Sequence, residues 1–161
     1  ALARAGILPD PVPPAVGAWA GRLAHLYAER LPRAADLPER AAFLFDFTPS
    51  RSLDDPAVRE ALCDPGHRRV VEALARRLEG APLDAPRFQA IADEVRRETG
   101  AKGKDLYHPI RVALTGAASG PELVRLLPVI EEGSRLPLGR RVAPCAERVR
   151  ALLLASAGTG R

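Results

Sequence analysis

The sequence predicts an all-α fold, a helical bundle without a sheet. Ala, Leu and Arg dominate the composition and β-branched residues are scarce, which favours helices over strands. No stretch alternates apolar and polar residues over the length of a strand. Hydrophobic residues make up 47% of the 161 residues, enough to bury a core, so the composition excludes an intrinsically disordered chain.

Proline and capping residues mark the first two predicted helices. Pro14 suits the first turn of a helix, where its missing N–H costs nothing, and Pro32 ends this helix. Its apolar residues recur at helical spacing: Val16, Trp19, Leu23, Leu26 and Tyr27. Asp36 and Glu39 form a capping pattern that opens a second helix. The apolar run of this second element is Phe43, Leu44, Phe45 and Phe47.

Glycine and proline delimit the later helices. A third helix starts at Asp55-Pro56, a fourth occupies 67–79, and a Gly- and Pro-rich boundary follows at 80–86. The later helices are expected to end at Gly100 and Gly116, to begin at Gly120-Pro121, and to begin again at Pro144. We predict a helical subdomain at residues 1–80, a second at 81–157 and a flexible tail at 158–161.

Positive charge is concentrated in the second half. Residues 1–80 hold eleven basic and eleven acidic side chains, whereas residues 81–161 hold thirteen and nine, so the net charge of +4 arises there. This excess is compatible with polyanion binding. Of the 24 basic residues 22 are Arg, which GC-rich coding also explains. Aromatic residues are only 4%, too few for an RNA-binding surface of stacked rings.

Catalytic and metal-binding patterns are missing from the sequence. It contains no GxSxG, HExxH, GxxxxGK[ST] or GxGxxG motif in a suitable context. Cys63 and Cys145 form no CxxC pair, and His25, His67 and His108 lack metal-ligand spacing. We therefore expect no catalytic centre, no metal site and two buried thiols in the reducing cytoplasm. No apolar run approaches the length of a membrane span.

The most informative segment is KGKDLYHPIRVALTGAASGPEL, residues 102–123. Its two lysines, Lys102 and Lys104, are the only ones in the chain, and Gly103 between them lets a phosphate approach closely. Arg111 lies on the helix that Gly116 ends, beside the expected start of the next helix. An exposed helix start offers free N–H groups and a positive dipole end. Physics alone leaves open an ordinary helical corner with solvated charges.

The same segment resembles the C-terminal region of bacterial glutamyl-tRNA synthetases, in which a KGK-x-L-x-x-P-[IL]-R-x-A-[LV]-TG-x-x-x-x-P-x-L pattern recurs. The resemblance extends to LARAGIL at 2–8 and LYAERLPRAADLPERAAFLFDF at 26–47. It implies an α-helix cage followed by a smaller helical domain, both binding the anticodon of tRNA-Glu. After Ile130 the chain departs from the family pattern with a longer, proline-broken segment.

The resemblance also implies roles for individual residues. Arg30 matches the arginine that recognises the third anticodon base and prefers C over G. Arg111, Pro121 and Leu123 match residues that hold the first two bases. Many relatives have Thr where this chain has Gly120, so a hydroxyl contact is expected to be lost there. An Arg fork satisfies two acceptors of a splayed base, with about 1–3 kcal/mol of discrimination.

The catalytic domain of this family, with its HIGH-type and KMSKS-type motifs, is not in the sequence. ATP and Mg are therefore expected only for that domain, which would be a partner of this chain in its parent enzyme. An alternative is a stand-alone helical module that binds another protein. A DNA-binding helix-turn-helix protein is disfavoured because residues 121–131 carry only Arg125 as a basic side chain and the chain lacks Asn.

Overall fold

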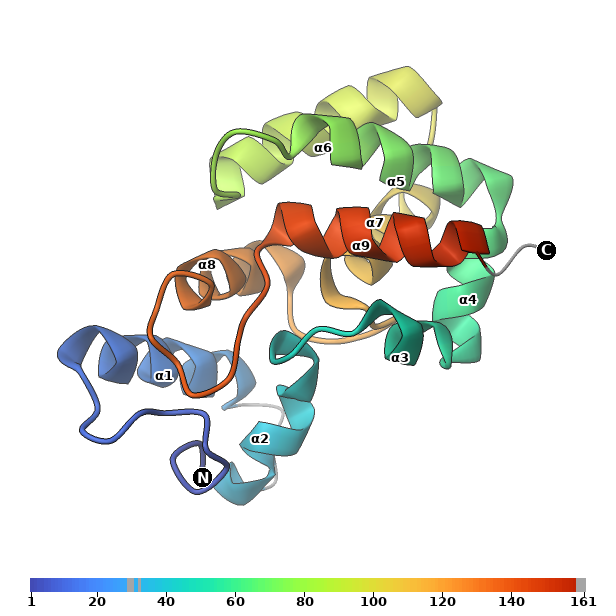
Figure 1. The fold of residues 1–161 in the computed structure, drawn as a ribbon. Helices are drawn as coiled ribbons and strands as arrows, with labels where there is room; N and C mark the ends of the chain where they lie inside the picture. The colour runs from blue at the N-terminus through green and yellow to red at the C-terminus, as the bar shows by residue number, and fades with distance from the viewer. Residues whose placement is uncertain (29–30, 32, 159–161) are drawn as a thin grey trace.

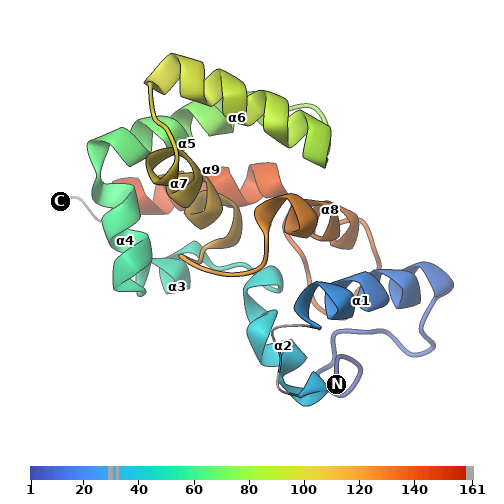
Figure 2. The same cartoon turned by 180° about the vertical axis from the view of Figure 1, so that it is seen from behind.

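The protein is all-helical in the computed structural model, which describes residues 1–28, 31 and 33–158. The helices are α1 Pro14–Tyr27, η1 Ala34–Asp36, α2 Leu37–Arg40, η2 Ala42–Leu44, α3 Pro49–Leu53, α4 Pro56–Cys63, α5 Pro65–Arg77, α6 Ala85–Thr99, α7 Lys104–Thr115, α8 Leu123–Gly133 and α9 Cys145–Gly158. Helices α5 and α6 lie side by side and form one outer layer (Figures 1 and 2). Helices α7, α8 and α9 form the middle of the molecule, and α1 and α2 cover the opposite side.

Helix α1 packs against α8 by the face that the sequence predicts. Its buried residues are Val16, Trp19, Leu23, Leu26 and Tyr27, the whole predicted set. The indole N–H of Trp19 donates to the carbonyl of Val129 at 2.9 Å. A Cβ added at Gly133 would lie 3.0–3.1 Å from the Trp19 ring, so the glycine permits this close approach.

Helices α1 and α8 run antiparallel. Arg22 forms an ion pair with Glu132 near the end of α8, whereas Leu26, one turn further along α1, lines a groove together with Arg125 in the first turn of α8. The end of α1 therefore lies beside the start of α8, as both views show.

The prediction of a second helix that continues into the apolar run was wrong. Helix α2 has only four residues, Asp36 makes no side-chain cap, and Phe45 is extended and pairs with Val142 in an isolated bridge. The carbonyls of Phe43 and Leu44 accept hydrogen bonds from the buried guanidinium of Arg148 at 3.0 and 2.6 Å. These tertiary partners replace the hydrogen bonds that a helix would supply.

Aspartate caps start the middle helices. Asp55, Asp64 and Asp84 accept from the backbone N–H of Ala57, His67 and Arg87 at 2.9, 2.8 and 2.8 Å. The cap at Asp55 confirms the predicted third helix. Helix α5 begins two residues before the predicted 67, and α3 was not predicted.

The helix ends around the 102–123 segment fit the prediction except at one point. Gly100 and Gly116 adopt the left-handed conformation at the ends of α6 and α7, as predicted. Helix α8 begins at Leu123 after the N-cap Glu122, so the predicted start at Gly120-Pro121 was two residues early. Pro121 lies before the helix, and its carbonyl accepts a hydrogen bond from the side chain of Arg111.

Helix α9 also differs from its prediction. It begins at Cys145, one residue after Pro144, and continues through Gly158, the first residue of the predicted tail. The other tail residues, 159–161, lie outside the described residues.

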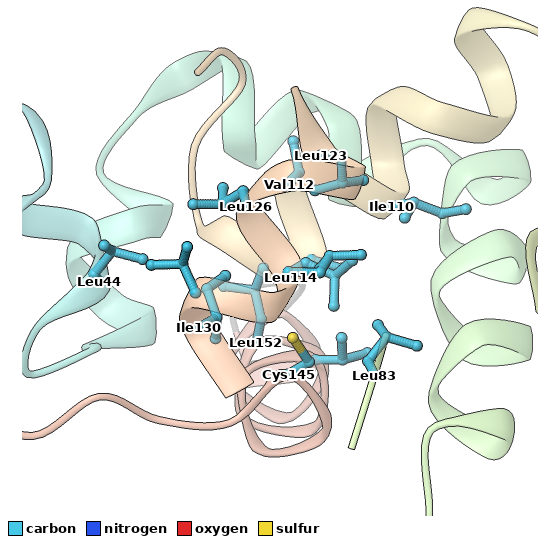
Figure 3. Close-up of a cluster of buried hydrophobic side chains, with 14 of the residues drawn as sticks. Leu44, Leu83, Ile110, Val112, Leu114, Leu123, Leu126, Ile130, Cys145 and Leu152 are labelled. Carbon is cyan, nitrogen blue, oxygen red and sulfur yellow. The ribbon is translucent and has the colours of Figure 1, made fainter. Parts of the chain in front are cut away.

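Both halves of the chain contribute to one continuous core. Figure 3 shows Leu44 from the first half beside side chains of α7, α8 and α9. Leu126 is fully buried in α8, as its spacing predicted. Residues on both sides of position 80 pack into this common core. The boundary between two subdomains near residue 80 stays a prediction.

Candidate nucleic-acid interface

Three predicted site residues meet where α7 approaches the start of α8. The Nη1 of Arg111 donates to the carbonyl of Pro121 at 2.9 Å. A Cβ placed on Gly120 would lie 3.5 Å from the same nitrogen. The connection between the two helices therefore folds back against the guanidinium of Arg111.

A cavity of about 460 Å³ lies at this corner. Two of its basic side chains, Lys104 and Arg111, lie about two turns apart on α7, and Leu123 contributes the first residue of α8. Its full lining is Phe88, Gln89, Lys104, Tyr107, His108, Arg111, Glu122, Leu123 and Val124. The cavity thus combines apolar side chains, basic side chains and one carboxylate, that of Glu122. Such a mixture is typical of small-ligand sites.

The other predicted site residues are distributed as follows. Lys102 is exposed but does not line the cavity, and Gly120 is exposed beside it. Pro121 is buried, and Leu123 is only 7% exposed, so each offers a small edge to a ligand in this conformation. Arg30 lies outside the described residues; it follows the end of α1 by three positions in the sequence.

Tight packing fixes the end of α7. The hydroxyl of Thr115 donates to the carbonyl of Arg111 at 2.7 Å and accepts from the N–H of Ala117 at 3.1 Å. Gly116 has a φ of 68°, and a Cβ there would collide with Ser52 and lie 2.9 Å from the ring of Phe47. Only glycine satisfies both demands, which explains why the helix ends with Gly at this position.

The cavity is electrostatically positive. Burial lowers the pKa of His108, and the nearby charges of His67, Lys104 and Arg111 lower this pKa further, so the imidazole is neutral at pH 7. Neither Lys102 nor Lys104 forms an ion pair with any carboxylate in the described part of the chain. Their charges are therefore available to an anionic ligand.

Sequence reasoning missed several residues of this site. Tyr107 and His108 were present in the quoted motif but received no role at the cavity, and Phe88 and Glu122 were not associated with it. A helical-wheel argument would have found Tyr107, because it lies three residues after Lys104 and four before Arg111.

Other basic residues are engaged elsewhere. Arg140 pairs with Asp46 at 2.7 Å, and Arg141 makes a bidentate pair with Glu147 at 2.7 and 2.6 Å. Within residues 1–28, 31 and 33–158, no three His, Cys, Asp or Glu side chains gather as metal ligands. None of the described helices has the length and apolar character to cross a membrane. Cys145 is buried as predicted, whereas Cys63 is exposed, so the prediction of two buried thiols was wrong for Cys63.

The fold and the site together define an all-helical binding module with a positive cavity at an interhelical corner. The chain belongs to the family described as "Anticodon binding domain", whose sequence profile matches residues 8–134. This range includes α1 through α8 and therefore every residue that lines the cavity.

Curated relatives are glutamate–tRNA ligases. The chain is 54% identical over 60 residues to glutamate–tRNA ligase 2 of Methylorubrum populi, covering 37% of this chain and 13% of that protein. It is 30% identical over 130 residues to the ligase of Listeria monocytogenes, covering 80% and 26%. It is 34% identical over 122 residues to the ligase of Lysinibacillus sphaericus, covering 76% and 25%. The chain thus spans about a quarter of these last two relatives. No solved structure matches the chain significantly.

Proposed function

We propose that the chain binds the anticodon loop of tRNA-Glu as the RNA-reading part of a glutamate–tRNA ligase. The observation that carries this proposal is the cavity between α7 and α8, in which Lys104, Arg111 and Leu123 meet inside the segment that matches the anticodon binding domain family. Single-stranded loops expose the base edges and phosphates that such a site recognises.

Arg111 is the proposed base-reading residue of the cavity. Its guanidinium has five N–H donors, and the bond from Nη1 to the carbonyl of Pro121 uses one of them and orients the planar group. A planar guanidinium of this kind matches the paired acceptors of a base edge. Leu123 and the edge of Pro121 supply apolar contact, and Gly120 leaves space beside Nη1.

Phosphate contact is assigned to the two lysines. Lys102 and Lys104 are exposed and flank Gly103, whose φ of 52° turns the chain at the start of α7. A lysine contributes affinity for RNA through its charge and not through base identity. The lysines therefore raise affinity for every tRNA, whereas Arg111 distinguishes among them.

Arg30 is the proposed reader of the third anticodon base, on the strength of the family resemblance. Support comes from the antiparallel pairing of α1 and α8, because the end of α1, which Arg30 follows in sequence, lies beside the α8 start. Arg30→Gln should then equalise binding of anticodons that end in C and in G.

The catalytic domain of the parent enzyme is the second proposed partner. The relatives are ligases of which this chain spans about a quarter, so activation of glutamate with ATP and Mg belongs to the remaining part of such a protein. No residue of this chain is proposed to hold ATP or Mg.

Fluorescence anisotropy tests the proposal directly. The chain is titrated with labelled tRNA-Glu and with the same tRNA carrying an exchanged anticodon. We expect tighter binding of tRNA-Glu, and loss of this preference in Arg111→Lys, which keeps the charge but not the planar fork. Equal affinity of the unaltered chain for both RNAs would contradict anticodon reading, and absence of any binding would favour the protein-interaction module.

A further inference from the structure

Tyr107 is an unusual aromatic residue in this molecule. Large exposed hydrophobic side chains in the described part of the chain are Val12, Tyr107 and Leu154, and Tyr107 is the aromatic one, with 41% of its surface exposed. The other rings pack in or against the core: Trp19, Tyr27, Phe43, Phe45, Phe47 and Phe88. The ring of Tyr107 therefore contributes less to the core than any of these.

The position of Tyr107 relates it to the cavity between α7 and α8. It lies three residues after Lys104 and four before Arg111, so the three side chains share one face of α7, and all three line the cavity. A ring between two cations is the arrangement by which proteins hold single-stranded nucleic acid, with bases on the ring and phosphates on the charges.

We infer that Tyr107 is a stacking residue that holds one unpaired base of the bound RNA loop against its ring. The inference rests on the proposed function and adds a base-binding element to it. No hydrogen bond within the described residues restrains the Tyr107 hydroxyl, and Leu123 and Phe88 provide an apolar boundary on the same cavity. The ring face is therefore accessible for a base to pack on.

Stacking differs from base-edge reading in its selectivity. Every base has a π-face, so a stacking ring adds affinity with little dependence on sequence. Tyr107→Leu should consequently weaken binding of tRNA-Glu and of the anticodon-exchanged tRNA by a similar factor, about 5- to 150-fold. Tyr107→Phe keeps the ring and removes only the hydroxyl, so its affinity should stay within about twofold of the unaltered chain.

The experiment uses the 161-residue chain, both variants and an anticodon stem–loop of tRNA-Glu carrying 2-aminopurine at one loop position at a time. Stacking on an aromatic ring quenches this fluorescent base. We expect quenching at one loop position with the unaltered chain and with Tyr107→Phe, and its loss with Tyr107→Leu at saturating protein. Circular dichroism checks that all three proteins unfold at the same temperature.

The outcomes separate the two proposals. If the unaltered chain binds no tRNA, the proposed function fails. If it binds and Tyr107→Leu binds equally well, or if Tyr107→Leu quenches the same position, the stacking role is overturned while the proposed function stands.

Discussion

The arginines of α5 and α6 and the basic residues of α7 belong to one Arg-rich chain, yet their surroundings differ. On the outer layer Arg77 bonds to Glu94 and Glu98 at 2.9 and 2.6 Å, and Arg76 also pairs with Glu98. These hydrogen bonds raise the pKa of Arg77, and the bond to Glu98 contributes more than the bond to Glu94. The positive charges of Arg76 and Arg77 are therefore offset by neighbouring carboxylates.

The corner between α7 and α8 has the opposite character. Lys102 and Lys104 have no carboxylate partner in the described part of the chain, and Arg111 donates to the carbonyl of Pro121. A count of basic residues does not distinguish these regions. The pairing of each cation determines where a polyanion is attracted.

Arg148 lies in a third environment, the protein core. Its substitution should have the largest effect, a loss of folding stability. It is fully buried, and its three nitrogens donate to the carbonyls of Ala143, Phe43 and Leu44 at 2.7, 3.0 and 2.6 Å. Burial lowers its pKa to about 10. Arg148→Ala would leave two buried carbonyls and one partly buried carbonyl without this donor and should lower the free energy of unfolding by about 3–5 kcal/mol.

Urea unfolding measures this effect, with Arg150→Ala as the matched control. Arg150 lies on the same helix and forms an exposed pair with Glu79 at 3.0 Å, so its loss should cost only about 0–1 kcal/mol. Equal effects of the two substitutions would show that the Arg148 bonds do not stabilise the junction between α9 and residues 43–44.

The second largest effect is expected on tRNA affinity, when the two lysines without carboxylate partners are substituted. The double substitution Lys102→Ala and Lys104→Ala should weaken binding of all tRNAs about equally. It should also reduce the slope of log affinity against log salt by about 1.4, since each phosphate contact contributes about 0.7 on a single strand.

Arg76→Ala with Arg77→Ala removes the same formal charge from the outer layer and serves as the control. This pair should leave the salt slope unchanged. A similar loss of slope in both double variants would mean that only net charge matters, which would contradict a localised RNA surface.

The smallest expected effect is a loss of folding stability on acidification, which His108 causes. Because its pKa is lowered in the folded protein, the unfolded chain binds a proton near pH 6.5 while the folded chain stays neutral to a lower pH. Stability is then complete above about pH 6.5 and falls as the pH drops from there toward the folded pKa. Unfolding of His108→Gln measured between pH 7.5 and 5.5 should show a shallower decline. A decline as steep as that of the unaltered chain would assign the effect to other groups.

Much of the fold followed from local signals. The buried face of α1, the Asp55 cap and the left-handed glycines at 100 and 116 obey rules that involve only neighbouring residues. The prediction of a helix after α2 was wrong because Arg148, about a hundred positions away, donates to the carbonyls of this segment. Such a long-range partner leaves no trace in local periodicity.

The candidate site was predictable in part. The motif placed Lys104, Arg111 and Leu123 together, and the structure brings them to one cavity. The start of α8 was set two residues too early, because the bond between Arg111 and the Pro121 carbonyl depends on tertiary folding. The role of Tyr107 was not predicted, because the sequence does not show whether a single aromatic ring on a helix is buried or exposed.

Amide hydrogen exchange on adding tRNA-Glu tests the central claim most directly, since it compares the two regions in one sample. We expect slower exchange at residues 103–107 and 116–124, with α5 and residues 92–99 of α6 unchanged. Protection confined to α5 and α6, or spread evenly over both regions, would contradict an RNA surface at the α7–α8 corner.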